Sequence, residues 1–169
     1  MSTLIKTEIK SRSTDFLLKE DIPAYTFSPS ALLKMEKEIL GIYVSAHPLS
    51  YYRQELTIRL SPKQICIRSH HISQLKTGQS VLIAGLLIQV RRQFTKHHEV
   101  MAFLLLEDET GLFEAIAFPE VFHNHFSLFV KDKLLMIKGI VNNKNGDTKL
   151  IIQKMTDIHS CLKIWHNQI

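Results

Sequence analysis

A change in the spacing of apolar residues near Gln79 constrains the fold of this chain more than any other feature. Before Gln79, apolar side chains recur at helical spacing, most clearly at Leu32, Met35, Ile39 and Tyr43. After it come short segments rich in β-branched and apolar residues, bounded by turn sequences. The expected strands span residues 80–90, 101–107, 112–118, 133–142 and 148–155. We therefore expect a helical segment followed by a mainly β domain.

The order of these segments predicts the topology of the β domain. Three strands come first, then a short amphipathic helix that begins at Pro119, then two more strands. This is the order of the OB-fold, a five-stranded Greek-key barrel, whereas an SH3-like barrel lacks the helix. Gly85, in the middle of the long first strand, is a place for a bulge or a sharp bend. The inward-facing residues expected on the helical segment are Val121, Phe122, Phe126 and Phe129.

The same patterns divide the chain into four parts: a mobile N-terminal tail (1–27), a helical connector (28–78), the OB-fold domain (79–158) and a C-terminal segment (159–169). In the connector, Ser28 and Pro29 are typical of a helix start. Pro48 is expected to stop this helix, because the residue before a proline disfavours helical backbone. A second short helix is expected from Tyr51. The C-terminal segment is a short helix or a tail.

Composition excludes several classes of protein. The longest apolar run, residues 80–90, is too short for a membrane span, and the N-terminus lacks the apolar stretch of a signal peptide. Cys66 and Cys161 form no C-x-x-C pattern and are expected to be reduced thiols in the cytoplasm. A net charge of +5 permits a nucleic-acid partner without establishing one.

No arrangement of residues predicts catalysis, a cofactor or a metal ion. The pairs His70-His71 and His97-His98 would point to opposite faces of a strand, and no cysteine cluster completes a zinc site. The acidic run 107–109 lies on a predicted tight turn, where Asp108 or Thr110 can bond to local backbone. The sequence also lacks the nucleophile and phosphate-binding motifs of common enzyme families.

The loop between the first two barrel strands carries the best candidate binding residues. OB-folds bind single strands across strands two and three, between the loops that join strands one to two and four to five. The first of these loops holds Arg91, Arg92 and Lys96, with Phe94 among them as a stacking platform for a base. The second holds Lys144. The alternative is a solvated hairpin tip that is basic by chance.

The segment from Met35 to Leu49, MEKEILGIYVSAHPL, resembles the E-K-E-x-L-G-x-Y-x-S-x-H-P-L segment of the alpha subunit of bacterial DNA polymerase III, a C-family polymerase. In that family the segment precedes an OB domain. The similarity continues, in the same order, through residues 72–80, 90–92, 101–103, 106–111 and 118–122. It covers roughly residues 23–155 and is too long and ordered to arise by chance.

The resemblance implies an OB module that contacts single-stranded template near a polymerase active site. The resemblance carries this contact surface over first to Arg91, Arg92 and Lys96, and second to Phe94, Phe103 and Lys144. The family's palm, with its metal-binding aspartates, cannot fit in 169 residues, so no polymerase activity is expected. Residues 13–17 stand where the family often carries a clamp-binding peptide but lack its usual glutamine.

Three functional hypotheses follow. The first is a nucleic-acid-binding module in DNA replication or repair, with single-stranded DNA or RNA as its partner and no catalysis of its own. The second is an accessory protein whose connector helix docks onto a polymerase or another replisome subunit. The third is one part of a split polymerase whose catalytic residues lie on another chain.

Overall fold

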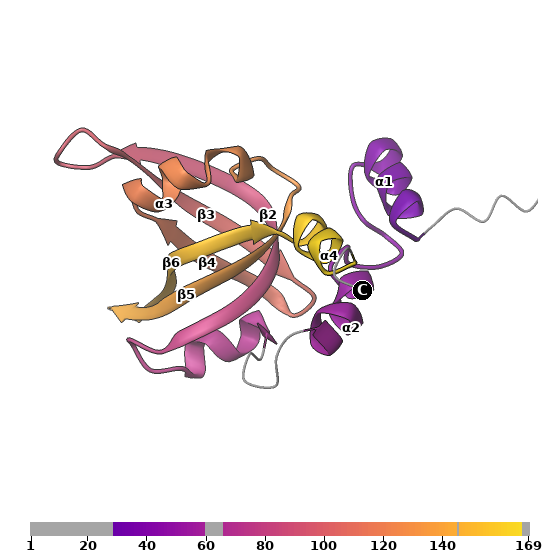
Figure 1. Ribbon diagram of the computed structural model, residues 1–169, viewed down its shortest axis with the longest axis horizontal. Coiled ribbons are helices and arrows are strands. Elements are labelled where there is room, and N and C mark those ends of the chain that lie inside the picture. Colours follow the sequence, from indigo (N-terminus) through magenta and orange to yellow (C-terminus); the bar gives the residue numbers. More distant parts are fainter. Residues whose placement is uncertain (1–28, 60–65, 145, 167–169) are drawn as a thin grey trace, which may run out of the picture.

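The computed structural model describes residues 29–59, 66–144 and 146–166. Two connector helices lie beside a strongly curved sheet, and a C-terminal helix packs between them and the sheet (Figure 1). The elements in chain order are α1 (Pro29–Leu40), α2 (Ser50–Arg59), β1 (Cys66–Ile67), η1 (Ser69–Gln74), β2 (Ser80–Phe94), β3 (Val100–Asp108), β4 (Gly111–Ala117), α3 (Pro119–Asn124), η2 (Phe126–Leu128), β5 (Leu134–Lys144), β6 (Asp147–Asp157) and α4 (Ile158–His166).

The predicted OB-fold is confirmed. The five long strands follow the order β2-β3-β4-β6-β5, and a further pairing of β2 with β5 closes the barrel. β4 and β6 pair in parallel over residues 114–116 and 149–151, whereas the other long strands pair antiparallel. The short β1 pairs in parallel with β2. It lies within the connection that the sequence predicts to be irregular or strand-like.

The barrel interior is a single apolar cluster. Its fully buried side chains include Ile83, Leu104, Leu106, Ile137 and Leu150. A second cluster lies on the outside of the barrel, where the connector packs against the first halves of β2 and β5. It consists of Leu49, Leu56, Ala84, Leu86, Leu134, Met136, Ile158 and Leu162. The connector is therefore packed onto the barrel through its own small core.

The bulge expected near Gly85 lies further along the strand. The register of β2 with β3 shifts between Leu87 and Gln89. Gly85 instead permits close packing, since a Cβ there would lie 2.9 Å from the Phe113 ring. Gly139 is more constrained, because a Cβ would lie 2.7 Å from both the Ile151 carbonyl oxygen and Leu150 Cγ.

This bulge changes the phase of β2. Before it, odd-numbered residues such as Val81 and Ile83 face the barrel interior, and even-numbered ones pack against the connector. After it, Val90 packs against the interior cluster, whereas Gln89, Arg91 and Gln93 face out. Which side a residue of the second half faces is therefore set by the bulge.

Three details of the helical segments differ from expectation. The first helix ends at Leu40, where Gly41 adopts a φ of 75° and its N–H donates to the Lys37 carbonyl. Among residues 31–40 of α1, Leu33 is the buried side chain, 4% exposed, while three residues of the expected apolar series are exposed, with Ile39 at 75%. The exposed members are Leu32, Met35 and Ile39, and the fourth member, Tyr43, lies beyond the helix and is half-buried.

In the α3–η2 segment, Phe122 and Phe129 are buried and Val121 is half-buried, as predicted, but Phe126 is 58% exposed. The helical turn that carries it is a separate 3₁₀ segment, which rotates its side chain out of the inward-facing series. For the C-terminal segment the sequence predicts a short helix or a tail, and the structure shows a helix, α4, over residues 158–166. The predicted tail 1–27 and the segment 13–17 lie outside the described residues, and the domain boundaries stay predictions.

Candidate nucleic-acid interface

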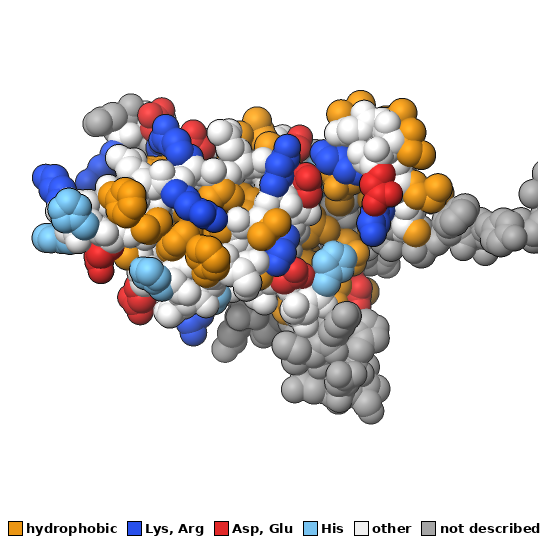
Figure 2. Space-filling view, turned by 90° about the horizontal axis from the view of Figure 1, so that it is seen from above, with side chains coloured by type: hydrophobic (Ala, Val, Ile, Leu, Met, Phe, Trp, Pro, Cys, Tyr) orange, Lys and Arg blue, Asp and Glu red, His pale blue; other side chains and the backbone are white. Residues whose placement is uncertain are grey.

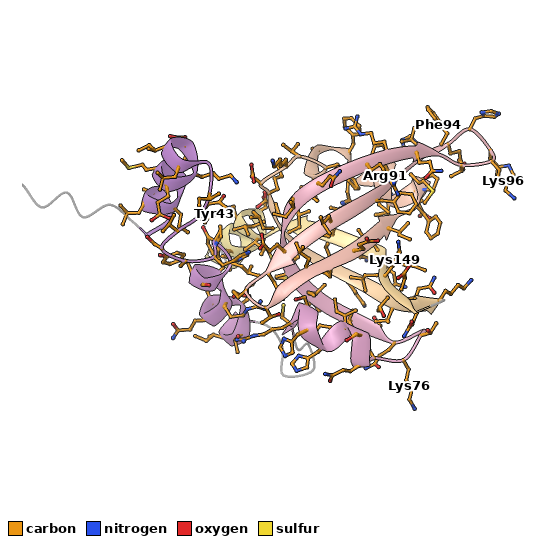
Figure 3. All side chains as sticks on the ribbon, turned by 180° about the vertical axis from the view of Figure 1, so that it is seen from behind. Tyr43, Lys76, Arg91, Phe94, Lys96 and Lys149 are labelled. Atoms are coloured by element: carbon orange, nitrogen blue, oxygen red, sulfur yellow. The ribbon has the colours of Figure 1, made fainter. Side chains whose placement is uncertain are left out.

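The β2–β3 hairpin extends beyond the barrel and carries the candidate basic loop at its end (Figure 3). Its tight turn is closed by backbone bonds, with the N–H of Thr95 donating to the Glu99 carbonyl at 2.8 Å and that of His98 to the Thr95 carbonyl at 3.0 Å. His98 takes a φ of 59° in this turn. Phe94 and Lys96 are exposed there, with Phe94 at 69%.

The outward side of the sheet forms a row of side chains in register across four strands. Arg91 on β2 pairs with Phe103 on β3, Phe103 with Ile116 on β4, and Ile116 with Ile151 on β6. A cation therefore stands at one end of an aromatic and apolar row that runs across the strands. We call this the sheet-face row.

Arg91 and Phe103 are in direct contact. The guanidinium carbon lies 5.1 Å from the ring centroid, a cation–π geometry. A shallow depression of about 230 Å³ surrounds them, lined also by Gln89, Leu105 and Glu114. A planar base can stack on a half-exposed ring in such a place while the guanidinium meets the adjoining phosphate.

A second row, displaced along the strands, brings Lys149 onto this surface. Gln89 pairs with Leu105, Leu105 with Glu114, and Glu114 with Lys149. The Lys149 ammonium lies 2.6 Å from the Glu114 carboxylate, and both side chains are partly exposed. This exposed ion pair contributes at most about 1 kcal/mol to stability, so an incoming phosphate can compete for the lysine.

The depression continues past the second row toward η1. A hollow of about 440 Å³ shares Leu105 and Glu114 with the first depression and extends to Asp147 and Lys149. A third, of about 270 Å³, shares Leu112 with the second and ends at His70. Together they form a groove across β3 and β4, the location at which OB-folds hold single strands.

Arg92 lies on the opposite side of the hairpin from Arg91, because neighbouring residues of a strand point to opposite faces. Its guanidinium carbon is 5.7 Å from the Phe122 ring centroid and 5.5 Å from that of Phe126, on the segment that closes the barrel end. Phe94 comes two residues after Arg92 in the strand, so its side chain points to the same side of the hairpin as that of Arg92. The candidate loop is thus divided between two surfaces.

Lys144 lies on the outer side of the sheet at the end of β5. It pairs with Asp147, two positions along the strands from the pair formed by Asn142 and Lys149. Of the six candidates, the structure brings together Arg91 and Phe103 on the sheet face, with Lys144 at its far edge. Arg92 and Phe94 face the other side, and Lys96 is at the hairpin tip.

Sequence reasoning missed Lys149, Ile116, Ile151 and Glu114. Ile116 and Glu114 reach the sheet face through the β3–β4 hairpin. Lys149 and Ile151 join it only through the parallel pairing of β4 with β6, which connects residues far apart in the chain. No local sequence pattern predicts the pairing of β4 with β6. A systematic test of which strands must be neighbours in a closed five-stranded barrel could have found it.

The acidic turn is structural. Asp108 is buried and its carboxylate accepts hydrogen bonds from the Ser69 N–H and hydroxyl, both at 2.7 Å, and from the Thr110 N–H at 2.8 Å. Burial alone would raise the pKa of this carboxyl, but these hydrogen bonds outweigh burial and hold the pKa below its usual value. The predicted bonding of this turn to local backbone is confirmed.

Arg53 joins the connector to the same turn. Its Nε donates to Glu109 Oε1 at 3.1 Å, its Nη2 contacts the other oxygen of that carboxylate, and it lies 4.0 Å from Asp108. Burial alone would raise the pKa of the Glu109 carboxyl, but the Arg53 contact keeps it below its usual value. The sequence offered no signal for this contact, which spans 56 residues.

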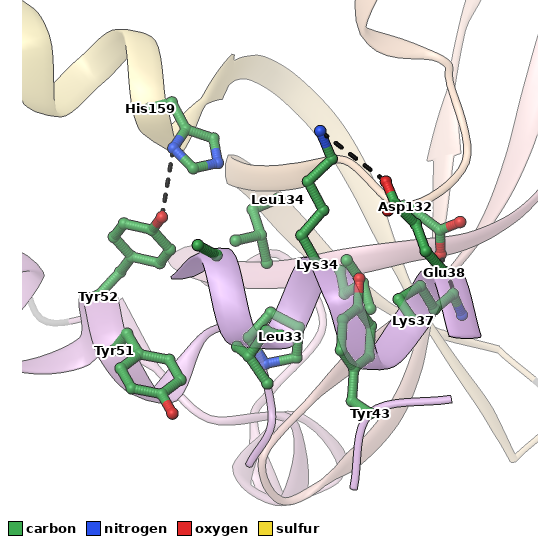
Figure 4. Close-up of a pocket in the computed structure, with 13 residues that line it drawn as sticks. Leu33, Lys34, Lys37, Glu38, Tyr43, Tyr51, Tyr52, Asp132, Leu134 and His159 are labelled. Carbon is green, nitrogen blue, oxygen red and sulfur yellow. Dashed lines mark hydrogen bonds and ion pairs between the residues drawn. The ribbon is translucent and has the colours of Figure 1, made fainter. Parts of the chain in front are cut away.

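A cavity of about 610 Å³ lies between the connector and the barrel (Figure 4). Tyrosine and leucine side chains line it, and Tyr52 and His159 face each other at 3.4 Å from hydroxyl to Nδ1. Lys37 lies 3.6 Å from Asp132 and 5.0 Å from the Tyr43 ring centroid. Burial, followed by the nearby Asp132 charge, raises the pKa of Tyr43.

Over the described residues, no three His, Cys, Asp or Glu side chains are grouped so that they could hold a metal ion. Within the same ranges, no helix has the length and apolar character needed to cross a membrane.

Comparison with known proteins identifies the fold family. The family model named tRNA_anti-codon, described as an OB-fold nucleic acid binding domain, matches residues 72–158. The chain belongs to this OB-fold family. The nucleic-acid-binding class expected from the sequence is thereby confirmed.

The resemblance to the DNA polymerase III alpha subunit is also confirmed. That subunit is 39% identical to this chain over 123 residues in Bacillus subtilis, 30% over 130 in Vibrio cholerae and 28% over 125 in Aquifex aeolicus. These matches cover 73%, 76% and 73% of this chain, and 10%, 11% and 10% of the relatives. The chain thus spans about a tenth of the length of these curated relatives.

Among solved structures, the chain is similar to an aspartyl tRNA synthetase from Entamoeba histolytica, with a TM-score of 0.47 and 15% identity over 58% of this chain and 22% of that one. It is also similar to a domain of replication protein A from Methanococcus maripaludis, with a TM-score of 0.43 and 20% identity over 52% of this chain and 91% of that domain.

Proposed function

We propose that the outer sheet face binds single-stranded DNA without strong sequence preference, in DNA replication or repair, and that the chain has no catalytic activity of its own. The observation that carries the proposal is the in-register contact of Arg91 with Phe103, at the mouth of a groove across β3 and β4. The polymerase relatives support DNA as the nucleic acid. This role places the protein in the cytoplasm, with the DNA.

The chemistry of the face favours a single strand over a duplex. Phe103 and the isoleucines of the sheet-face row offer apolar contact to unstacked bases, which a duplex keeps inside. Arg91, at the β2 end of this row, and Lys149, on β6 in the second row, can each meet a phosphate. Aromatic contact to bases with cations on the backbone is the general mode of sequence-tolerant single-strand binding.

The test is a fluorescence anisotropy titration with labelled single-stranded DNA, duplex DNA and single-stranded RNA at two salt concentrations. Phe103→Ala should weaken binding to the single strand by about 5- to 150-fold, the range for loss of one stacked base. Tyr51→Ala, an exposed aromatic on α2, is the matched control and should leave the affinity unchanged. Equal affinity of wild type and Phe103→Ala would refute the proposed site.

The salt dependence tests the cations independently. Arg91→Gln should reduce the slope of log K against log salt by about 0.7, the contribution of one phosphate contact on a single strand. Lys76→Gln, an exposed lysine between η1 and β2, away from the hairpin (Figure 3), should leave the slope as it is. An unchanged slope in Arg91→Gln would exclude Arg91 as a phosphate contact.

A second candidate function is docking onto a polymerase or another replisome subunit. The exposed apolar series on α1, Leu32, Met35 and Ile39, favours it. Gel filtration of the chain with a purified polymerase III alpha subunit would test it. Leu32→Asp with Ile39→Asp should abolish co-elution without changing affinity for DNA.

A further inference from the structure

The side of the β2–β3 hairpin that carries Arg92 and Phe94 forms a surface of its own. These residues continue the inward-facing series of β2, which Val90 ends inside the barrel. Because the strand runs on past the barrel, the same side of the hairpin there extends over α3 and η2 instead of the core. Figure 2 shows basic and hydrophobic side chains side by side over this part of the molecule.

An aromatic cluster lies beneath Arg92. The Phe122 ring centroid is 5.6 Å from that of Phe126, at an interplanar angle of 90°, and 4.8 Å from that of Phe129. Phe122 and Phe129 are buried and belong to the barrel core, but Phe126 is not part of it. Core packing therefore explains two of these rings and leaves the third, which contacts the arginine from outside.

The charges around Phe126 favour an anionic partner. Arg92 stands 5.5 Å from its ring, and the Lys133 ammonium donates to the Ser127 carbonyl at 2.7 Å, one residue further on. Of the acids in this segment, Asp132 is paired with Lys37 at 3.6 Å, and Glu120 lies in the first turn of α3. Exposed aromatic rings interleaved with cations are the pattern that binds single strands.

We propose that the hairpin–α3 surface, formed by Arg92, Phe94, Phe126 and Lys133, is a second contact for the same single strand that occupies the sheet face. Single-stranded DNA that leaves the groove at its Arg91–Phe103 end meets the β2–β3 hairpin. The other side of this hairpin carries the hairpin–α3 surface. Phe126 then provides a second stacking position and Arg92 a second phosphate contact. This inference rests on the proposed function of the sheet face.

The proposal predicts that contact depends on strand length. OB-folds occupy about 4 to 16 nucleotides, so oligonucleotides near these two limits separate the two surfaces. A labelled strand of about 5 nucleotides should reach the sheet face alone, whereas one of about 16 should reach both. Each variant is compared with wild type on the same oligonucleotide, which removes the statistical advantage of the longer strand.

Phe126→Ala should weaken binding of the longer strand by about fivefold or more and leave the shorter one unchanged. Arg92→Gln should do the same, and Phe126→Trp should restore the wild-type affinity. Phe103→Ala should weaken both strands, and Tyr51→Ala neither. Thermal unfolding of each variant, with an unchanged Tm, establishes that the exposed ring was removed without loss of fold.

The outcomes separate the two proposals. If wild type fails to bind the shorter strand and Phe103→Ala has no effect, the proposed function of the sheet face is wrong. If the shorter strand binds but Phe126→Ala and Arg92→Gln bind the longer strand as wild type does, this inference is overturned, and the exposed aromatic surface belongs to a protein contact.

Discussion

The two halves of β2 differ in what covers them. In the first half, residues 80–88, one side faces the barrel interior and the other packs against the connector, so nearly every side chain is held. In the second half, residues 89–94, Val90 still packs against the barrel interior. Beyond it, one side joins the sheet face and the other the hairpin–α3 surface, and both are open. One strand thus joins the connector to the barrel and presents both candidate binding surfaces.

This difference separates stability from binding along a single element. Substitutions in the covered half should change the free energy of unfolding, and substitutions in the open half should change affinity. Each of the following experiments tests whether stability and binding are separated along β2 in this way.

The largest effect is expected for Leu86→Ala. Leu86 is 2% exposed in the cluster between connector and barrel, and truncating such a side chain costs about 2–5 kcal/mol through lost burial and the cavity left behind. Urea unfolding should show this as a lower midpoint. Gln93→Ala in the open half is the control and should change the free energy of unfolding by no more than about 0.5 kcal/mol. Comparable losses in the two variants would contradict the division of the strand.

A smaller effect, dependent on pH, is expected for Asp108→Asn at the end of β3. Loss of the carboxylate weakens the hydrogen bonds from Ser69 and Thr110 and should cost about 1–3 kcal/mol at pH 7. Because the folded pKa of Asp108 lies below the unfolded value of about 3.9, its stabilisation is present above that pH and is lost as the pH falls through the folded pKa.

Urea midpoints between pH 7 and pH 2 should therefore fall more steeply for wild type than for Asp108→Asn, and the two curves should converge in acid. The variant keeps the acid dependence that Glu109 contributes through Arg53, so its curve should slope without being flat. Parallel curves would show that Asp108 is not the carboxylate that couples stability to pH.

The smallest effect is expected for Glu114→Gln in the groove. Removing the carboxylate 2.6 Å from Lys149 frees the ammonium and removes a negative charge from the path of the phosphates. Affinity for single-stranded DNA at low salt should rise by about two- to fivefold, equivalent to an exposed ion pair of up to about 1 kcal/mol. Fluorescence anisotropy titration measures this affinity. Glu99→Gln at the hairpin tip makes the same change in net charge and serves as the control. A weaker affinity in Glu114→Gln would exclude Lys149 as a contact.

Much of the fold could be predicted because its signals are local. The strands, the turn at Asp108 and the helix at Pro119 each follow from a few neighbouring residues, and their order specifies the barrel. The division of Arg91 from Arg92 could be expected from strand alternation, but which of the two faces the groove depends on the bulge at 87–89.

The rest could not be predicted because it depends on contacts between distant segments. Lys149 reaches the groove through the pairing of β6 with β4, and Arg53 reaches Glu109 across 56 residues. The expected apolar face of α1 was wrong for a similar reason: Leu33 is the side chain that packs, because the position of the helix against the barrel selects it.

The bulge in β2 also determines how this protein tolerates insertions and deletions. Loss of the extra residue, Ile88, would restore regular alternation and leave Arg91 on the sheet face and Arg92 on the opposite side. Loss of Val90 would instead turn Arg91 toward the barrel end and Arg92 toward the groove, without altering any binding residue. Residues added at the tip, between Thr95 and Glu99, would lengthen the hairpin and leave the alternation intact. In descendants of this sequence, length should therefore vary at the tip or at the bulge and stay constant between Gln89 and Phe94.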